Sequence, residues 1–292
     1  MKPPRFDYAA PTTVAEAVAL LQQHDTEAKI LAGGQSLMPL LNMRLTRPGI
    51  LVDLGRIPEL NYIRQANGTI AIGAMTTKRS VQDSDLVESR QPLLHAATAL
   101  IGHGAIRNRG TVGGSLAHAD PAAEYPAIAV ALDAELQAVG PNGARTIKAA
   151  DFFVSYLTTA LEPAEILTEV QFPVLAARTG WSCLEVVRRH GDFAMAGAAV
   201  TVTLAGDGRC SGARIVLFGV GAVPLRAAAA EQVVIGQEPG EKAFHDAGQQ
   251  AAAAVEEPMS DVHASGEYRR YLAQVMTRRA LAEAVSRAGT AA

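Results

Sequence analysis

Cysteine is scarce in this chain, with only Cys183 and Cys210 among its 292 residues. An iron–sulfur cluster takes about four cysteine ligands, so two cysteines cannot hold one. Their spacing also lacks the pattern of a zinc site. We therefore expect two ordinary small side chains, in a protein of a reducing compartment such as the cytoplasm. The chain by itself is predicted to carry no metal.

Long apolar runs and an excess of basic charge are missing too. The chain has 26 basic and 29 acidic residues, which gives a net charge of −3. The basic residues form no cluster that could bind nucleic acid. Met1–Arg5 leads into polar sequence, so no signal peptide is expected, and no run of about 18 apolar residues indicates a membrane span. Since 49% of the residues are hydrophobic, the chain can bury a sizeable core in two domains or one large one.

Familiar signatures of catalysis and nucleotide binding are also absent. Seven histidines are scattered without the spacing of helical metal ligands, and neither a nucleophile elbow nor a Walker A motif occurs. Two segments, 102–107 and 219–224, imitate a dinucleotide fingerprint. Arg107 and Pro224, however, stand where the third glycine belongs. We interpret both segments as turns, and the sequence gives no support to hydrolase or Rossmann-type chemistry.

What the chain does contain is a pair of matching double-glycine motifs. The first is Ala32-Gly33-Gly34-Gln35-Ser36, after an apolar run, and the second is Thr111-Val112-Gly113-Gly114-Ser115. Paired glycines followed by a hydroxyl residue let backbone N–H groups approach a phosphate closely. One such loop is weak evidence, but two indicate a ligand with two phosphates. The sequence therefore predicts a dinucleotide held mainly by main-chain N–H groups of two loops.

Periodicity and turn residues predict a mixture of helices and strands. Thr13 and Glu16 form a capping box that opens a helix, and Asp120 with Pro121 is a plausible N-cap and N1 pair for a helix through Leu132. Further helices are expected at 92–101 and 267–288, the latter with Tyr271, Val275, Ala282 and Val285 among its apolar positions. The expected strands are 29–31, 50–53, 62–65, 69–72, 135–139, 144–148, 166–172, 181–187, 197–204 and 213–218, with an irregular stretch at 102–108 and a linker at 173–180. Two β-hairpins are expected among them, one turning at Asn67-Gly68 and one at Pro141-Asn142-Gly143.

Three polar residues near the second motif are candidate ligand contacts. His118 is either a polar neighbour of the cofactor, its covalent anchor, or an ordinary loop histidine. The carboxylates of Asp120 and Glu124, one helical turn apart, can accept hydrogen bonds from sugar hydroxyls. The alternative is an N-cap for Asp120 and a solvated first-turn position for Glu124.

Taken together, these motifs resemble the two flavin signatures of one family. Residues 32–39 and 111–115 are similar to those of the FAD-binding medium subunit of molybdenum hydroxylases, the xanthine dehydrogenase and aerobic carbon monoxide dehydrogenase family. The similarity extends along essentially the whole chain. It includes residues 6–8, 106–110, 191–194 and 268–269.

The resemblance implies a fold and a domain division. An α+β, vanillyl-alcohol-oxidase-type (PCMH-type) FAD-binding domain is expected at residues 1–176, in two subdomains at about 1–57 and 58–176. A small α+β C-terminal domain with a three-stranded antiparallel sheet is expected at 177–292. FAD is expected to be bound without a covalent link.

The resemblance also implies residue roles, carried over position by position. Phe193 matches an aromatic, often Tyr, beside the isoalloxazine, and Ser115 stands where Asn is more frequent. Some relatives bind FAD through a Lys where Val187 stands, a role that Arg188 or Arg189 is a candidate to fill. No catalytic residue is expected on this chain. The expected FAD-binding residues are Ala32, Gly33, Gly34, Gln35, Ser36, Ile101, Thr111, Val112, Gly113, Gly114, Ser115, His118, Asp120, Glu124, Leu161, Arg188 and Phe193.

Partners follow from the same resemblance. A large molybdopterin subunit and a small subunit with two [2Fe–2S] clusters are expected, commonly as a dimer of heterotrimers. Electrons would pass from substrate through the clusters to FAD and then to an external acceptor. One alternative is a free-standing flavin oxidase of the wider superfamily, and another is a scaffold that has lost its flavin. A catalytic cluster would favour the first, and a colourless preparation the second.

Overall fold

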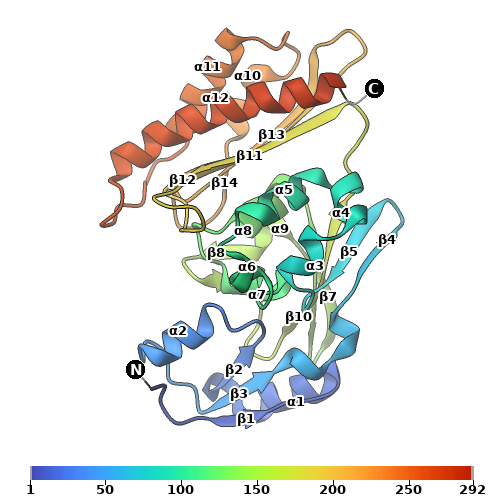
Figure 1. Ribbon diagram of the computed structural model, residues 1–292, viewed down its shortest axis with the longest axis vertical. Helices are drawn as coiled ribbons and strands as arrows, with labels where there is room; N and C mark the ends of the chain where they lie inside the picture. The colour runs from blue at the N-terminus through green and yellow to red at the C-terminus, as the bar shows by residue number, and fades with distance from the viewer. Residues whose placement is uncertain (1, 291–292) are drawn as a thin grey trace.

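The structure of the protein, a computed structural model, describes residues 2–290. Three units follow one another along the long axis (Figure 1). We call them the N-terminal unit, which carries β1–β3, the middle unit, which carries β4–β10, and the C-terminal unit, which carries β11–β14. None of the helices within residues 2–290 combines the length and hydropathy that a membrane span requires.

The N-terminal unit is a small parallel sheet covered by one helix. The strand order is β1-β3-β2, and the buried side chains of Ala17, Val18 and Leu21 on α1 pack with Val52 of β3. Helix α1 begins as predicted, because the Thr13 hydroxyl accepts from the backbone N–H of Glu16 at 3.2 Å. The elements are β1 (Asp7–Ala9), α1 (Val14–His24), β2 (Ala28–Leu31), α2 (Leu37–Asn42) and β3 (Ile50–Asp53), with single 3₁₀ turns at Asp25–Glu27, Leu54–Arg56 and Pro58–Leu60.

The middle unit is built on a five-stranded antiparallel sheet of order β4-β5-β10-β6-β7. Both predicted hairpins form, and the first turns at Asn67 and Gly68, which have φ of 50° and 76°. Its strands are β4 (Ile63–Ala66), β5 (Thr69–Gly73), β6 (Glu135–Gly140), β7 (Gly143–Lys148) and β10 (Ile166–Pro173), beside a small pair β8 (Phe153–Ser155) and β9 (Thr158–Thr159). Its helices are α3 (Lys78–Gln82), α4 (Asp85–Arg90), α5 (Pro92–Leu100), α6 (Gly104–Arg107), α7 (Val112–His118), α8 (Glu124–Ala131) and α9 (Ala149–Phe152).

Three expectations for this unit were wrong. The second glycine motif is the first turn of α7 rather than a loop. The stretch expected to be irregular contains the short helix α6. Helix α8 begins at Glu124 and not at Asp120, because the Asp120 carboxylate closes its own turn by accepting from the N–H of Ala122 at 2.9 Å.

The C-terminal unit is a four-stranded antiparallel sheet, one strand more than expected, of order β11-β12-β13-β14. Helix α12 lies across one face of this sheet (Figure 1). The predicted apolar face of α12 was wrong in part: Val275 and Val285 pack against the core, but Tyr271 is 59% exposed, whereas Leu272, Ala273 and Met276 are buried. The elements are β11 (Thr179–Val186), β12 (Ala196–Leu204), β13 (Cys210–Phe218), β14 (Leu225–Arg226), α10 (Ala228–Val234), α11 (Glu241–Ala253) and α12 (Gly266–Thr290).

The middle and C-terminal units share one hydrophobic core. Ala199 of β12 and Val216 and Phe218 of β13 belong to the same buried cluster as Tyr125 and Ile128 of α8. The backbone N–H of Gly219 also donates to the carbonyl of Pro121, at 2.8 Å. The C-terminal sheet is therefore packed against the helices of the middle unit.

Candidate functional site

The first glycine motif forms the turn between β2 and α2. Gly34 has φ +72°, a left-handed conformation that other residues adopt only with strain. A Cβ on Gly33 would lie 2.2 Å from the carbonyl oxygen of Arg109, so only glycine fits there. Gly34 therefore permits the turn, and Gly33 permits close packing against the segment that precedes α7.

The turn leaves a row of backbone donors without a protein acceptor. Within residues 2–290, the N–H groups of Gly33, Gly34, Gln35 and Ser36 donate no hydrogen bond. These residues are partly buried. Partly buried N–H groups are almost always paired, so four consecutive unpaired donors indicate a site for an anion. The carbonyl of Gly33 is fixed by the Gln35 side-chain amide, which donates to it at 3.0 Å.

The second glycine motif is different, because the amides of its residues 112–115 are all bonded within the protein. The N–H of Val112 donates to the Thr76 carbonyl at 3.0 Å and that of Gly113 to the Ala74 carbonyl at 2.8 Å. Thr111 caps the helix: its hydroxyl accepts from Gly114 at 3.0 Å and its carbonyl from Ser115 at 3.1 Å. The N–H groups of residues 112–115 therefore already have protein acceptors, whereas the sequence led us to expect them to hold a ligand.

What the second motif supplies is a surface on which the first can pack. A Cβ on Gly113 would lie 2.4 Å from the Cβ of Ala74, and a Cβ on Gly114 would lie 3.2 Å from the Cβ of Ala32. A Cβ on Gly110 would likewise lie 3.7 Å from the Cγ of Gln35. The two motifs thus meet in space, as expected, and glycine permits the contact.

Two oppositely charged side chains are buried next to this contact. Lys78 at the start of α3 is 8% exposed, and Glu124 at the start of α8 is 5% exposed. Neither side chain forms a hydrogen bond or a close ion pair with another residue in the described part of the chain. Lys78 lies 5.6 Å from the ring centroid of Tyr125. Burial lowers the pKa of the Lys78 ammonium and raises the pKa of the Glu124 carboxyl.

The three polar candidates near α7 lie in one region. His118 is the last residue of α7, and burial lowers the pKa of its imidazole, which favours the neutral form. Asp120 has one oxygen bonded to Ala122 and acts electrostatically on both His118 and Glu124. The solvated position considered for Glu124 was wrong, since its side chain is buried.

The remaining candidates lie toward the C-terminal unit. A Cβ on Gly191 would lie 2.7 Å from the His103 ring, so the loop that carries Phe193 packs next to Ile101. The Arg107 guanidinium fixes this segment by donating to the carbonyls of Ile101 and Gly102 at 2.9 Å each. Leu161 follows β9, which packs against α7. Phe193 is 62% exposed, so it is not a core residue.

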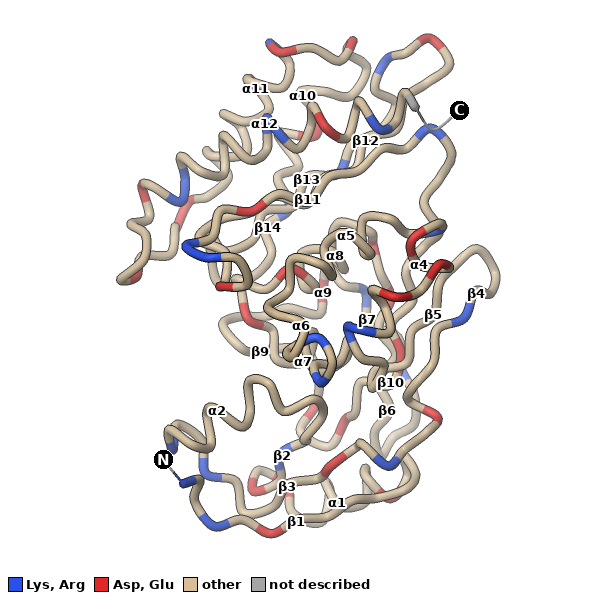
Figure 2. Tube along the Cα trace, viewed as in Figure 1, with Lys and Arg blue, Asp and Glu red and all other residues tan. Residues whose placement is uncertain are grey.

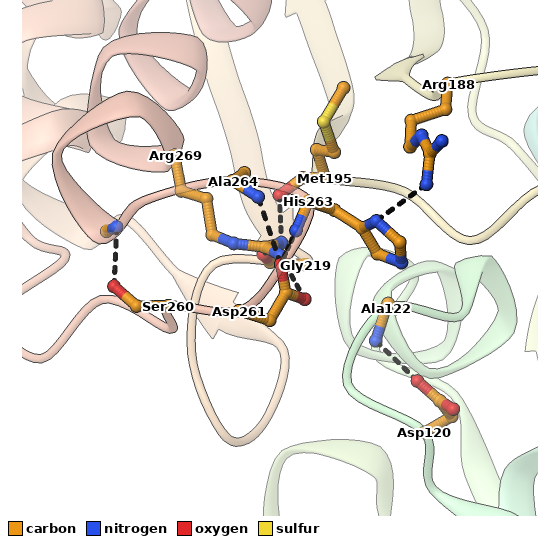
Figure 3. Close-up of polar contacts among 11 residues, drawn as sticks. Asp120, Ala122, Arg188, Met195, Gly219, Ser260, Asp261, His263, Ala264 and Arg269 are labelled. Carbon is orange, nitrogen blue, oxygen red and sulfur yellow. Dashed lines mark hydrogen bonds and ion pairs between the residues drawn. The ribbon is translucent and has the colours of Figure 1, made fainter.

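Arg188 is engaged with the C-terminal unit. Its Nη1 lies 2.9 Å from Nδ1 of His263, a contact that Figure 3 shows together with the Asp120 turn. Asp261 holds the same loop in place, because it accepts from the N–H groups of His263 and Ala264 and from the buried Arg269. Arg188 therefore already has a protein partner, whereas the side chain of Arg189 forms no hydrogen bond to another described residue, and only its backbone carbonyl accepts, from the N–H of Asp192 at 3.0 Å.

The sequence analysis missed Lys78. A lone lysine after a threonine looks like a solvated helix start, and only the packing of α3 on Gly110 buries it.

Figure 2 shows further basic positions beside α6 and α7, on the segment of Arg107 and Arg109. No group of His, Cys, Asp and Glu within residues 2–290 is arranged to hold a metal ion. The backbone amides and the cations of this site can thus bind an anionic ligand, and its carboxylates can accept from hydroxyl groups of that ligand.

Comparison with known proteins identifies the ligand. Residues 4–175 match the family described as "FAD binding domain in molybdopterin dehydrogenase", and residues 182–284 match the "CO dehydrogenase flavoprotein C-terminal domain". The chain belongs to this family of FAD-binding oxidoreductase subunits, and FAD is its cofactor. The free amides of the first motif fit a pyrophosphate, as expected for that cofactor.

Whole-chain relatives identify the type of subunit. The chain is 44% identical over 290 residues to the 6-hydroxypseudooxynicotine dehydrogenase complex subunit alpha of Paenarthrobacter nicotinovorans, which covers 99% of this chain and 97% of that one. It is 41% identical to the carbon monoxide dehydrogenase medium chain of Hydrogenophaga pseudoflava, in an alignment that covers 98% of this chain and 99% of that relative. A solved carbon monoxide dehydrogenase from the same organism superposes with a TM-score of 0.96 at 43% identity, covering 98% and 99%. The protein is a FAD-carrying medium subunit of the molybdenum hydroxylase type.

Proposed function

We propose that the chain carries electrons through FAD within a heteromeric molybdenum hydroxylase, and that it holds FAD mainly through the first glycine motif. The observation that carries this proposal is the row of four unpaired N–H groups at residues 33–36. A hydrogen bond to a charged group contributes roughly 1.5–3 kcal/mol, so four such donors provide much of the affinity for a pyrophosphate. FAD, when bound, accepts electrons and passes them on.

The other parts of the site have different roles. Lys78 offsets negative charge that the amides leave uncompensated, and Asp120 and Glu124 accept from hydroxyl groups of the cofactor. Phe193, exposed on its loop, covers one face of the flavin ring. We keep all the residues expected from the sequence as parts of the FAD site, and we add Lys78. Within the second motif we assign contact to the side chain of Ser115, and packing to Thr111, Val112, Gly113 and Gly114.

The partners proposed are a large molybdopterin subunit and a small subunit with [2Fe–2S] clusters, in a dimer of heterotrimers. Support comes from relatives named as a complex subunit and as a medium chain, and from the two cysteines of this chain. Substrate is selected on the molybdenum subunit. We propose a domain boundary at residue 176, a subdomain boundary at about residue 57, and a cytoplasmic location.

Reconstitution tests the cofactor assignment. The full chain, purified and loaded with FAD, is expected to bind one FAD per chain and to release it on acid precipitation, because no covalent link is proposed. Flavin that stayed with the precipitated protein would contradict non-covalent binding. A chain that remained colourless would instead favour the scaffold that has lost its flavin.

A second experiment tests the division of labour. The isolated chain is expected to oxidise no hydroxylase substrate, because it has no molybdenum site, while an artificial donor still reduces its FAD. Purification of the native complex should yield the two partner chains with molybdenum and iron. Bleaching of the isolated, metal-free chain by a substrate would support the free-standing oxidase.

A further inference from the structure

One buried arginine of the C-terminal unit is bonded to three segments outside its own helix. Arg269 on α12 is only 2% exposed, and arginine is almost never buried unless its guanidinium is paired. Its Nη1 donates to the carbonyl oxygens of Met195 and Gly219. Its Nη2 donates to the Asp261 carboxylate at 2.6 Å, and Figure 3 shows the three contacts together. A single guanidinium therefore joins α12 to three loops of the chain.

The first of these segments is the loop of residues 187–195, here called the aromatic loop because it carries Phe193. The N–H of Met195 donates to the carbonyl of Val186 at 2.8 Å and so closes the base of the loop, directly before β12. The carbonyl of the same residue accepts from Arg269. Both backbone groups of Met195 are thus fixed, and Phe193 lies two residues away.

The second segment is the turn at Gly219, which follows β13. Gly219 has φ +70°, and a Cβ there would lie 2.7 Å from the carbonyl oxygen of Ala194, so only glycine fits beside the end of the aromatic loop. Its carbonyl accepts from Arg269 at 2.6 Å, while its N–H donates to the carbonyl of Pro121 at 2.8 Å. Pro121 directly follows Asp120, whose carboxylate closes that turn. Gly219 therefore connects Arg269 to the turn that carries Asp120.

The third segment is the loop between α11 and α12. The Asp261 carboxylate accepts from the backbone N–H of His263 at 2.8 Å as well as from Arg269, and so holds the His263 imidazole in place. Nδ1 of that imidazole accepts from Nη1 of Arg188 at 2.9 Å. Arg188 lies near the start of the aromatic loop and Met195 at its end. The loop is therefore attached at both ends to groups that Arg269 bonds.

We propose that Arg269 is a positioning residue of the FAD site, which fixes the aromatic loop and the Asp120 turn beside the cofactor. It acts through the backbone of these segments and is assigned no contact with the cofactor itself. Because Phe193 is exposed, its place depends on the backbone that carries it. The inference rests on the proposed function for the presence of FAD, but the fixing of the loop is a property of the chain alone.

The shape of the guanidinium suits this role. Its N–H donors lie in one rigid plane, so a single group can bind two carbonyls and a carboxylate at once, whereas a lysine ammonium is a flexible point charge. Arg269→Lys should therefore keep the charge but lose part of the contacts to Met195, Gly219 and Asp261. The Gly219 carbonyl is buried, and a buried acceptor that loses its donor is costly.

Asp261→Asn tests the arrangement with the least disturbance. Asparagine retains the Oδ1 that accepts from the His263 N–H, but it places an amide against Arg269 where the carboxylate oxygen was. The Asp261 side chain is 41% exposed, so the fold should be retained. Asp207→Asn is the matched control, because its Oδ1 likewise accepts from a backbone N–H, that of Arg209, in a turn of the same unit.

Limited trypsin digestion of the FAD-free chain measures the aromatic loop directly, since Arg188 and Arg189 are exposed cleavage sites within it. Cleavage follows the population of the open loop, so the loss of one charged hydrogen bond should speed it about tenfold in Asp261→Asn. Arg269→Lys should be cut at least as fast, and Asp207→Asn at the wild-type rate. If Arg269→Lys does not fold, Asp261→Asn decides the question.

Two variants of His263 test the attachment at the start of the loop. His263→Ala removes the acceptor of Arg188 and should also be cut faster, whereas His263→Asn supplies an Oδ1 in place of Nδ1 and should restore the protection. Wild-type cleavage at residues 188–189 in Asp261→Asn would overturn the proposal. Faster cleavage at every site of the chain would overturn it too, because it would show a general loss of stability.

The FAD-loaded chain tests the consequence for the cofactor. Asp261→Asn should retain FAD through the first glycine motif, but its flavin absorbance band should shift and its reoxidation rate should change, as for Phe193→Ala. Asp207→Asn should match the wild type in both. An unchanged band and rate in an Asp261→Asn chain with a loosened loop would overturn the positioning role. A wild type that bound no FAD would instead refute the proposed function, while the digestion would still decide whether Arg269 fixes the loop.

Discussion

The N–H groups of residues 33–36 have no acceptor within residues 2–290, whereas those of residues 112–115 all donate to protein oxygens. The two segments nevertheless have nearly the same sequence pattern, with paired glycines followed within two residues by serine. In the first, the chain turns through a left-handed Gly34 and then enters α2. In the second, the glycines lie within the first turn of a helix. A glycine pair therefore indicates that other atoms come close to the backbone at that point. The local backbone conformation decides whether those atoms belong to a ligand or to another part of the protein.

The largest effect is expected from crowding the second motif. Gly113→Val would place a Cβ 2.4 Å from that of Ala74, in a fully packed part of the middle unit. Overpacking of this kind costs about 1–3 kcal/mol and occasionally more, so the melting temperature should fall sharply even without FAD. Gly206→Ala, which has open space around its Cβ, is the matched control and should melt as the wild type does. Equal melting of the two variants would show that the second motif is not a packing element.

Gly34→Ala is expected to act on binding more than on folding. Its left-handed φ makes alanine unfavourable by roughly 1–2 kcal/mol, and the strain reorients the unpaired N–H groups. FAD affinity should therefore fall by more than tenfold, with a smaller loss of thermal stability than in Gly113→Val. Calorimetric titration with FAD, beside thermal melts of the FAD-free protein, measures both. Unchanged affinity would remove the first motif from the site.

Lys78→Met tests whether a side chain near the second motif contributes the FAD affinity that the amides of that motif do not. Methionine retains the apolar length but removes the buried cation, so FAD should bind about tenfold more weakly while the fold remains intact. Lys148→Met, at an exposed position of β7, is the control and should bind normally. If the two variants bound FAD equally well, Lys78 would have no role in holding the cofactor.

Phe193→Ala should produce the smallest change in stability. The side chain is 62% exposed, so truncation should alter the free energy of unfolding by less than about 0.5 kcal/mol. A shifted flavin absorbance band and a changed reoxidation rate are expected, because the ring loses a cover that excludes water. Val262→Ala, at an even more exposed position, should leave both unchanged. Identical stopped-flow traces for wild type and Phe193→Ala would refute the covering role.

Local signals in the sequence predicted much of the fold. The capping residue Thr13 and the turn at Asn67-Gly68 act over a few residues, and both behave as predicted. The start of α8 was mispredicted, since Pro121 suits a first helical position but Asp120 forms a separate turn. The buried face of α12 was also missed, because alanines on both sides of the helix give little contrast and the packing of α11 and the sheet decides which side is covered.

The parts of the site that depend on glycine could be predicted from the sequence. The parts that depend on the burial of a side chain could not. Gly33 and Gly114 could be recognised in the sequence, and the structure brings them together. Lys78 could not, because it is a single charged residue whose burial depends on packing against Gly110, which is distant in sequence. The same holds for the amides of Val112 and Gly113, whose acceptors on Thr76 and Ala74 are distant in sequence.

Amide hydrogen exchange, measured for both motifs with and without FAD, tests the central comparison most directly. Without FAD, residues 33–36 should exchange rapidly and residues 112–115 slowly, because only the second set is bonded within the protein. Addition of FAD should protect residues 33–36 strongly and change residues 112–115 little. Protection gained at residues 112–115, with residues 33–36 unchanged, would contradict the account.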